Sequence, residues 1–102
     1  MLLMRSTYDS EEAARGAARA LIEARLACCA HVQALAASVY RWDGEVCEEP
    51  EWLLEARVPA AKQEAAAAAI ADGHPYDTPL VEAIPVAWLE PRYADWAASV
   101  TQ

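Results

Sequence analysis

Side chains that could bind a metal ion are few in this chain, and they lie in two short segments. Cys29 and His31 are two residues apart, so on a β-strand they share a face, an arrangement that suits a soft ion such as copper. His74 follows an alanine-rich run and precedes Pro75. For His74 we expect either a contact to a metal ion or ligand, or a cap in which its imidazole bonds a carbonyl of the preceding helix. For His31 the alternative is a buried or interfacial histidine that bonds a carbonyl.

Aromatic residues mark a first distinctive turn, Ser38–Glu45. Asp43-Gly44 between alternating apolar residues is a strong local signal for a two-residue β-hairpin turn. Tyr40 and Trp42 come just before this turn. An exposed hairpin tip with two aromatic rings favours aggregation of a monomer, so we expect a partner to cover it.

A second distinctive turn, His74–Pro79, holds Tyr76 between two prolines. We expect the main role of Tyr76 to be packing against its neighbours, with hydrogen bonding as a secondary role. The alternative is a contact to a ligand. The prolines hold the connection rigidly in either case.

No motif of a known catalytic type is present. The sequence has no nucleophile elbow, no glycine-rich phosphate loop and no HExxH or CxxC metal motif. Ser6, Ser38 and Cys29 are isolated nucleophiles with no base at a recognisable spacing. We therefore expect a protein that is not an enzyme.

Composition narrows the choice of partner and compartment. The 102 residues carry a net charge of −8, which disfavours nucleic acid and anionic membranes as partners. No apolar run approaches the length of about 18 residues that a membrane helix needs. Three cysteines, two of them adjacent, make a poor disulfide framework, so we expect reduced thiols that act as small apolar side chains. These features predict a cytoplasmic protein.

The hydrophobic periodicity predicts an alternation of strands and helices. Ser10 with two following glutamates is a good helix start, and Pro59 suits the first turn of a second helix that Gly73 ends. Pro50 is tolerable only near an edge or bulge of a strand, and the acidic stretch 45–51 is expected to be a solvated loop. The predicted strands are 2–8, 27–42, 52–58 and 80–86, and the predicted helices are 10–25, 60–72 and one that begins at Pro91.

This order predicts one α+β domain over residues 1–102. A split βαβ arrangement gives a four-stranded antiparallel sheet with two helices on one face, followed here by a C-terminal helix. A core of mostly alanine, leucine and valine at this size is marginal for a lone monomer, so we expect an oligomer.

With its residues placed on this predicted order of strands and helices, the chain resembles the CutA family, small proteins associated with divalent-cation tolerance. The similarity extends from about Thr7 to Val100 and rests on the order and spacing of several residues. These are Leu26-Ala27, Cys29, Ser38-Val39-Tyr40, Trp42, Gly44, His74-Pro75-Tyr76, Pro79, Tyr93 and Trp96. The resemblance implies a ferredoxin-like βαββαβ sandwich and a homotrimer in which long hairpins reach onto neighbouring subunits.

The resemblance also implies a link to the tolerance of divalent metal ions such as Cu(II). The family's metal proposals involve cysteine and histidine near the cleft between subunits. In this chain they leave His74 and Cys29, because serine and glycine occupy positions 6 and 73, and His31 joins them only through its spacing from Cys29. Ala34-Leu35 stands where the family commonly has a Pro-Gly kink, so the bend in the long strand is expected to differ. The hypothesis is a cleft between subunits that binds a metal ion or small ligand through Tyr40, Trp42, Arg57, His74 and Tyr76. The alternative is a trimer of the nitrogen-regulatory PII type that binds an effector or partner protein without metal.

Overall fold

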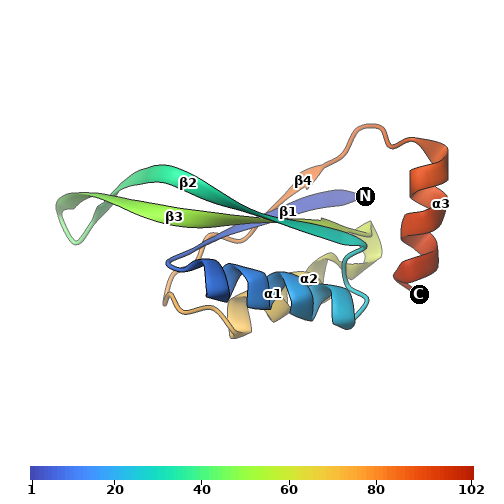
Figure 1. The fold of residues 1–102 in the computed structure, drawn as a ribbon, viewed down its shortest axis with the longest axis horizontal. Helices are drawn as coiled ribbons and strands as arrows, with labels where there is room; N and C mark the ends of the chain where they lie inside the picture. The colour runs from blue at the N-terminus through green and yellow to red at the C-terminus, as the bar shows by residue number, and fades with distance from the viewer.

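The computed structural model describes all of residues 1–102 as an α+β fold with the predicted element order. Figure 1 shows a twisted sheet, two helices beneath it and a third helix at one end. The elements are β1 (Leu2–Tyr8), α1 (Glu11–Glu23), β2 (Cys29–Trp42), β3 (Glu45–Val58), a 3-10 turn (Ala60–Lys62), α2 (Gln63–Asp72), β4 (Glu82–Pro85) and α3 (Pro91–Val100).

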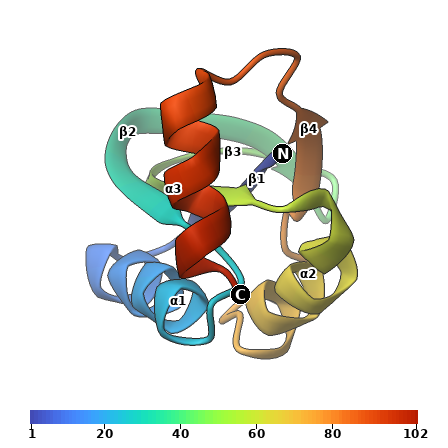
Figure 2. The same cartoon turned by 90° about the vertical axis from the view of Figure 1, so that its right-hand side faces the viewer.

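The sheet has the strand order β2-β3-β1-β4, and every neighbouring pair is antiparallel. This is the predicted four-stranded sheet. Helices α1 and α2 lie side by side on one face, while α3 stands across the end of the molecule (Figure 2). The β2–β3 hairpin projects far beyond the helices, which gives the chain extents of 46 × 24 × 21 Å.

Helix α1 begins as the sequence predicts. The Ser10 side chain accepts a hydrogen bond from the Ala13 backbone N–H at 3.1 Å, and two glutamates occupy the first turn. The predicted end at Arg25 is wrong, because α1 ends at Glu23 and Arg25 takes a left-handed φ of 59°. The chain turns there to enter β2, whose first residue is Cys29 rather than Ala27.

The hairpin turn is confirmed. Asp43 and Gly44 have φ values of 51° and 80°, the left-handed pair that a two-residue hairpin requires. The expectation of a solvated loop over residues 45–51 is wrong, because β3 begins directly after the turn at Glu45. Backbone pairing with β2 holds this acidic stretch as a strand, while most of its side chains stay exposed.

The bend in the long hairpin lies at an alanine pair. The β2–β3 register shifts between Leu35 and Ser38, which leaves Ala36 and Ala37 without register partners. Pro50 lies opposite this irregularity, between residues paired with Ser38 and Leu35. The bulge therefore accommodates a residue that cannot donate to a regular ladder.

Other boundaries differ from the sequence predictions in length. Strand β4 spans only Glu82–Pro85, and it pairs with Leu2–Arg5 of β1. The second helix begins as a 3-10 turn after Pro59 and becomes α-helical at Gln63. Gly73 does follow α2, but its φ of −97° is an ordinary backbone conformation.

The core lies between the sheet and the two-helix layer and consists of small and medium side chains. Alanines on α1, α2 and β3 let these elements approach closely. The members are Met4, Tyr8, Ala14, Leu21, Ala27, Leu54, Ala56, Val58, Ala66 and Ile70.

One ammonium group ties the ends of two helices together. Lys62 donates a hydrogen bond to the carbonyl of Arg25 at 2.9 Å, just after α1, and another to the carbonyl of Thr101 at the end of α3. The hydroxyl of Thr101 bonds the carbonyl of Ala97 at 2.8 Å. These contacts satisfy carbonyls that a helix end leaves without partners.

Two glycines give a matched test of the fold. We expect Gly44→Ala to lower the free energy of unfolding by about 1 kcal/mol, because φ of 80° is strained for a residue with a Cβ. Gly16→Ala is expected to raise it by up to about 1 kcal/mol, since Gly16 is inside α1 and no atom lies within 4 Å of an added Cβ. Urea unfolding at one chain concentration measures both. An unchanged stability in Gly44→Ala would contradict the left-handed turn.

Candidate functional site

The predicted site histidine, His74, is bound into the fold through both ring nitrogens. Its Nε2 lies 2.9 Å from the carbonyl oxygen of Thr7 and 3.0 Å from the hydroxyl oxygen of Ser6. Its Nδ1 lies 3.1 Å from the backbone nitrogen of Tyr76. The ring also stacks on Tyr8 with centroids 4.3 Å apart. The imidazole therefore bonds a carbonyl of β1, not one at the end of α2 as the capping prediction had it.

These contacts fix the tautomer and charge of His74. The Thr7 carbonyl can only accept, so Nε2 carries the proton; the Tyr76 N–H donates, so Nδ1 does not. Burial lowers the pKa of His74 from its ordinary value, and the Thr7 carbonyl and nearby Asp9 and Glu51 offset this only in part. The imidazole is thus held neutral, with no lone pair free for a metal ion.

Ser6 and His74 do not form a nucleophile–base pair in this arrangement. Ser6 is fully buried, and the nitrogen that faces its hydroxyl already carries a proton. A general base must offer a lone pair to the proton it removes. The contact is therefore a structural hydrogen bond.

Of the tyrosines near His74, two donate a hydrogen bond to a carboxylate and one has no hydrogen-bond partner. Tyr76 donates to Glu51 at 2.6 Å, and burial together with this bond raises the pKa of Tyr76. On the neighbouring strand Tyr40 donates to Glu49 at 3.3 Å. Tyr8 is 2% exposed and its hydroxyl has no partner. Glu49 and Glu51 on β3 thus hold the hydroxyls of Tyr40 and Tyr76, the two tyrosines that were predicted to bind a ligand.

A second cluster lies at the start of β2. The Sγ of Cys29 is 3.7 Å from the Nε2 of His31, so the structure brings together the pair that the sequence placed on one face. The hydroxyl of Tyr93, on α3, lies beside the thiols of Cys28 and Cys29; burial and these thiols raise the pKa of Tyr93 to about 12. All three cysteines of the chain are free.

The five predicted ligand-binding residues meet only in part within one protomer: the rings of His74 and Tyr76 lie 5.0 Å apart, and Tyr40 is close enough to Tyr76 to contribute to the raised pKa of its hydroxyl. Tyr40 and Trp42 lie on the hairpin, while His74 and Tyr76 follow α2. Arg57 is paired with Cys29 in the sheet register, at the opposite end of β3 from the turn. Nor do the predicted metal ligands converge: no three histidine, cysteine, aspartate or glutamate side chains are placed to hold an ion. Of the three predicted metal ligands, one protomer brings together only Cys29 and His31.

Sequence reasoning missed the contribution of buried polar residues on β1. Ser6 and Tyr8 alternate with outward residues and so face the core, where polar side chains are unusual. That pattern was a usable signal for a network around His74. Glu51 offered none, because its contact with Tyr76 joins segments far apart in the chain.

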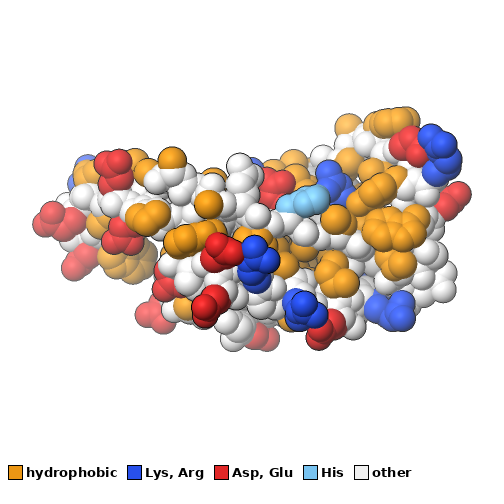
Figure 3. All heavy atoms as spheres, viewed as in Figure 1, with side chains coloured by type: hydrophobic (Ala, Val, Ile, Leu, Met, Phe, Trp, Pro, Cys, Tyr) orange, Lys and Arg blue, Asp and Glu red, His pale blue; other side chains and the backbone are white.

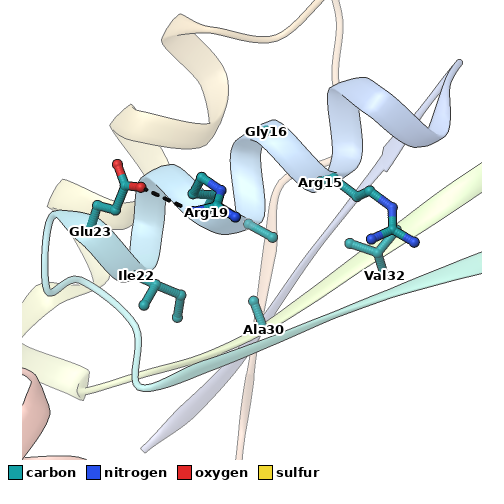
Figure 4. A pocket seen from close by; sticks show the side chains of 8 residues that line it. Arg15, Gly16, Arg19, Ile22, Glu23, Ala30 and Val32 are labelled. Carbon is teal, nitrogen blue, oxygen red and sulfur yellow. Dashed lines mark ion pairs between the residues drawn. The ribbon is translucent and has the colours of Figure 1, made fainter.

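A hollow of about 670 Å³ lies between α1 and the edge strand β2 (Figure 4). Ile22 points from the helix toward Ala30 on the strand, and Val32 continues the apolar floor. Arg15 and Arg19 stand along it, and each pairs with a glutamate four residues away on the same helix. The hollow thus combines an apolar floor with two ion pairs whose charges balance.

Fold and site together define a ferredoxin-like α+β protein with an extended β2–β3 hairpin, a buried histidine network and a C-terminal helix. A sequence model described as "CutA1 divalent ion tolerance protein" matches residues 2–100. The chain belongs to this family.

Relatives and solved structures agree with this assignment. The chain is 40% identical over 95 residues to "Divalent-cation tolerance protein CutA" of Thermus thermophilus, covering 88% of this chain and 87% of that protein. It is 32% identical to "Protein CutA" of Mus musculus over 94% of this chain, but spans only 54% of the mouse protein. A crystal structure of a CutA1 variant from Pyrococcus horikoshii OT3 superposes with a TM-score of 0.96 at 26% identity, covering 100% of this chain and 99% of the other. The Thermus thermophilus structure gives 0.88 at 37% identity, with 94% of each chain covered.

No helix of the structure is long and apolar enough to cross a membrane.

Proposed function

We propose that this chain is a trimeric, non-enzymatic, cytoplasmic protein of divalent-cation tolerance that binds a metal ion or small ligand at clefts between subunits. The observation that carries the proposal is the family match over residues 2–100. Relatives whose names state divalent-cation tolerance support it.

The hairpin surface supports assembly. Val39, Trp42 and Val46 are 65%, 58% and 65% exposed, so both faces of the projecting hairpin carry exposed apolar side chains: Val39 and Val46 on one face and Trp42 on the other. Figure 3 shows hydrophobic and acidic side chains interspersed on this end of the molecule. Strands β2 and β4 are both sheet edges with backbone groups free to pair. A closed ring of subunits covers both features at once.

The proposed cleft needs two subunits because not all of its residues meet in one: Trp42 lies beside the hairpin turn, and Arg57 lies at the opposite end of β3. Trp42 and Tyr40 project on the hairpin, while Tyr76 and His74 sit beside the helices. A hairpin that reaches onto a neighbour brings one subunit's hairpin toward the other's His74 turn. His74 then shapes the cleft as a neutral, fixed group and is not itself a metal ligand. The positive charge of Arg57 on β3 suits a small anionic ligand and not a metal ion.

Calorimetric titration of the assembled protein with Cu(II) and with Zn(II) tests the proposal. We expect saturable binding that is lost when the assembly is dissociated by Trp42→Ser with Val46→Ser, because a cleft between subunits exists only in the assembly. Trp88→Ser, at an exposed tryptophan outside the hairpin, is the matched control and should keep the binding. Binding that persists unchanged in dissociated protein, or no binding to the assembly, would contradict the cleft.

The PII-like alternative is favoured by one observation, the hollow lined by Arg15 and Arg19. Its size lies within the range of about 300–1,000 Å³ that is usual for small-molecule sites. In that case an effector binds without metal on the apolar floor, and Arg15 and Arg19 contact it only by exchanging their glutamate partners for it. An effector response in metal-free protein would separate this function from the first.

A further inference from the structure

A second hollow, of about 470 Å³, lies at the end of the molecule that carries α3 (Figure 2). Its walls are the turn at Pro59–Lys62, the loop at Val86–Leu89 and the side of α3 that carries Ala94 and Ala98; we call it the α3 groove. We propose that the α3 groove binds a small aromatic carboxylate, with the Lys62 ammonium as the partner of its charge. The inference is independent of metal and of the proposed cleft between subunits.

The Lys62 ammonium lines the α3 groove with one donor to spare. A lysine ammonium has three N–H donors, and here two of them bond the backbone carbonyls of Arg25 and Thr101. Both partners are neutral groups, and none of the four ion pairs in the chain includes Lys62. A half-buried cation thus keeps a free N–H and has no side-chain carboxylate to balance it. A carboxylate in the groove would supply that partner.

The charge of the α3 groove is opposite to that of the chain as a whole. The sequence has 16 acidic and 8 basic side chains, yet no acidic residue lines the groove and Lys62 is its only charged side chain. Glu90, which follows the loop, is paired with Arg92 at 3.1 Å. The groove is therefore complementary to an anion, although the net charge of −8 disfavours anions elsewhere on the surface.

The rest of the α3 groove suits a flat apolar body. Nine of its twelve lining residues are hydrophobic, and Trp88 is 74% exposed, the largest exposed fraction among the bulky apolar residues of the chain. An aromatic ring that stacks on this indole takes apolar surface of both partners out of water. Ala94 and Ala98 are one turn apart on α3, and their short side chains let a ring approach the helix closely. The volume is that of a small-molecule site.

Equilibrium dialysis of 2-naphthoate against metal-free protein tests the proposal. We expect saturable binding of one molecule per chain, and binding of the neutral isostere 2-naphthamide that is weaker by about fivefold, because only the carboxylate pairs with Lys62. Lys62→Met should weaken 2-naphthoate binding by a similar factor, and Trp88→Ser by about tenfold. Arg15→Met removes the same charge from the hollow between α1 and β2, so it is the matched control and should leave the affinity unchanged.

The comparison of the two ligands needs no substitution, so it holds even if Lys62→Met loosens α3. No binding of 2-naphthoate, or equal affinities for 2-naphthoate and 2-naphthamide, would overturn the proposal. An affinity that is unchanged in Trp88→Ser would overturn it too. So would binding that is lost in Arg15→Met and kept in Lys62→Met, because the ligand then lies in the other hollow. Circular dichroism of each variant checks that the fold is retained. Because no metal is present, none of these results bears on metal binding at the proposed cleft.

Discussion

His74→Ala should lower the free energy of unfolding by about 2–4 kcal/mol, the largest single-residue effect that we expect outside the apolar core. The substitution removes three hydrogen-bond contacts at once and leaves the Thr7 carbonyl, the Ser6 hydroxyl and the Tyr76 N–H without their partner. It also removes the ring that stacks on Tyr8. Urea unfolding at a fixed chain concentration gives the value.

His31→Ala is the matched control, because it removes an exposed imidazole instead of one bonded into the core. Its expected cost is below about 0.5 kcal/mol. Equal losses in the two variants would contradict the network described for His74.

The same network predicts how stability depends on pH. The pKa of His74 in the folded protein is lowered from its ordinary value of about 6.5, so below that value the unfolded chain binds a proton more readily. The stabilisation is therefore fully present above pH about 6.5 and is lost as pH falls through the lowered pKa of the folded state. His74→Ala should flatten this part of the curve of unfolding free energy against pH.

Trp42→Ser combined with Val46→Ser should convert the proposed trimer into monomers. Both side chains are more than half exposed in the single chain, at 58% and 65%, and lie close to the hairpin turn. Burying a large apolar side chain between subunits contributes about 1.5–3 kcal/mol, and a trimer loses that contribution at each of its three interfaces. Light scattering coupled to size-exclusion chromatography measures the mass directly.

Trp88→Ser tests whether the effect belongs to the hairpin. Trp88 is 74% exposed but lies between β4 and α3, at the other end of the molecule. We expect this variant to keep the mass of the unmodified protein. Dissociation in Trp88→Ser, with an intact assembly in the hairpin variant, would move the interface to the end that carries α3.

The fold was predictable because its signals are local. Asp43-Gly44 alone predicts the hairpin, and the φ values of 51° and 80° confirm it. Ser10 and Pro91 mark the starts of two helices correctly. The errors arose where pairing overrides composition: glutamates from 45 to 51 read as a loop, yet backbone bonds to β2 make them strand whatever their side chains favour.

The site was less predictable because its contacts are long-range. The imidazole of His74 bonds residues of β1 that lie 67 and 68 positions away, and no spacing rule reveals this. Cys29 and His31 were found because two residues on one strand share a face by geometry alone. A residue's chemistry was thus foreseen where its partner is a neighbour in sequence, and missed where the fold supplies the partner.

Lys62 gives α3 a built-in chemical reporter. It is the only lysine of the chain, and its amine is engaged with carbonyls at the ends of α1 and α3. An amine-directed reagent modifies a side chain held in this way only when the contact opens, so its rate reports how often the Lys62 amine leaves the carbonyls of Arg25 and Thr101. Reagents that couple lysine to lysine accordingly have one lysine amine per chain to react with, and that amine is hydrogen-bonded. Carboxyl- or thiol-directed chemistry is the better means of cross-linking the subunits of the proposed trimer.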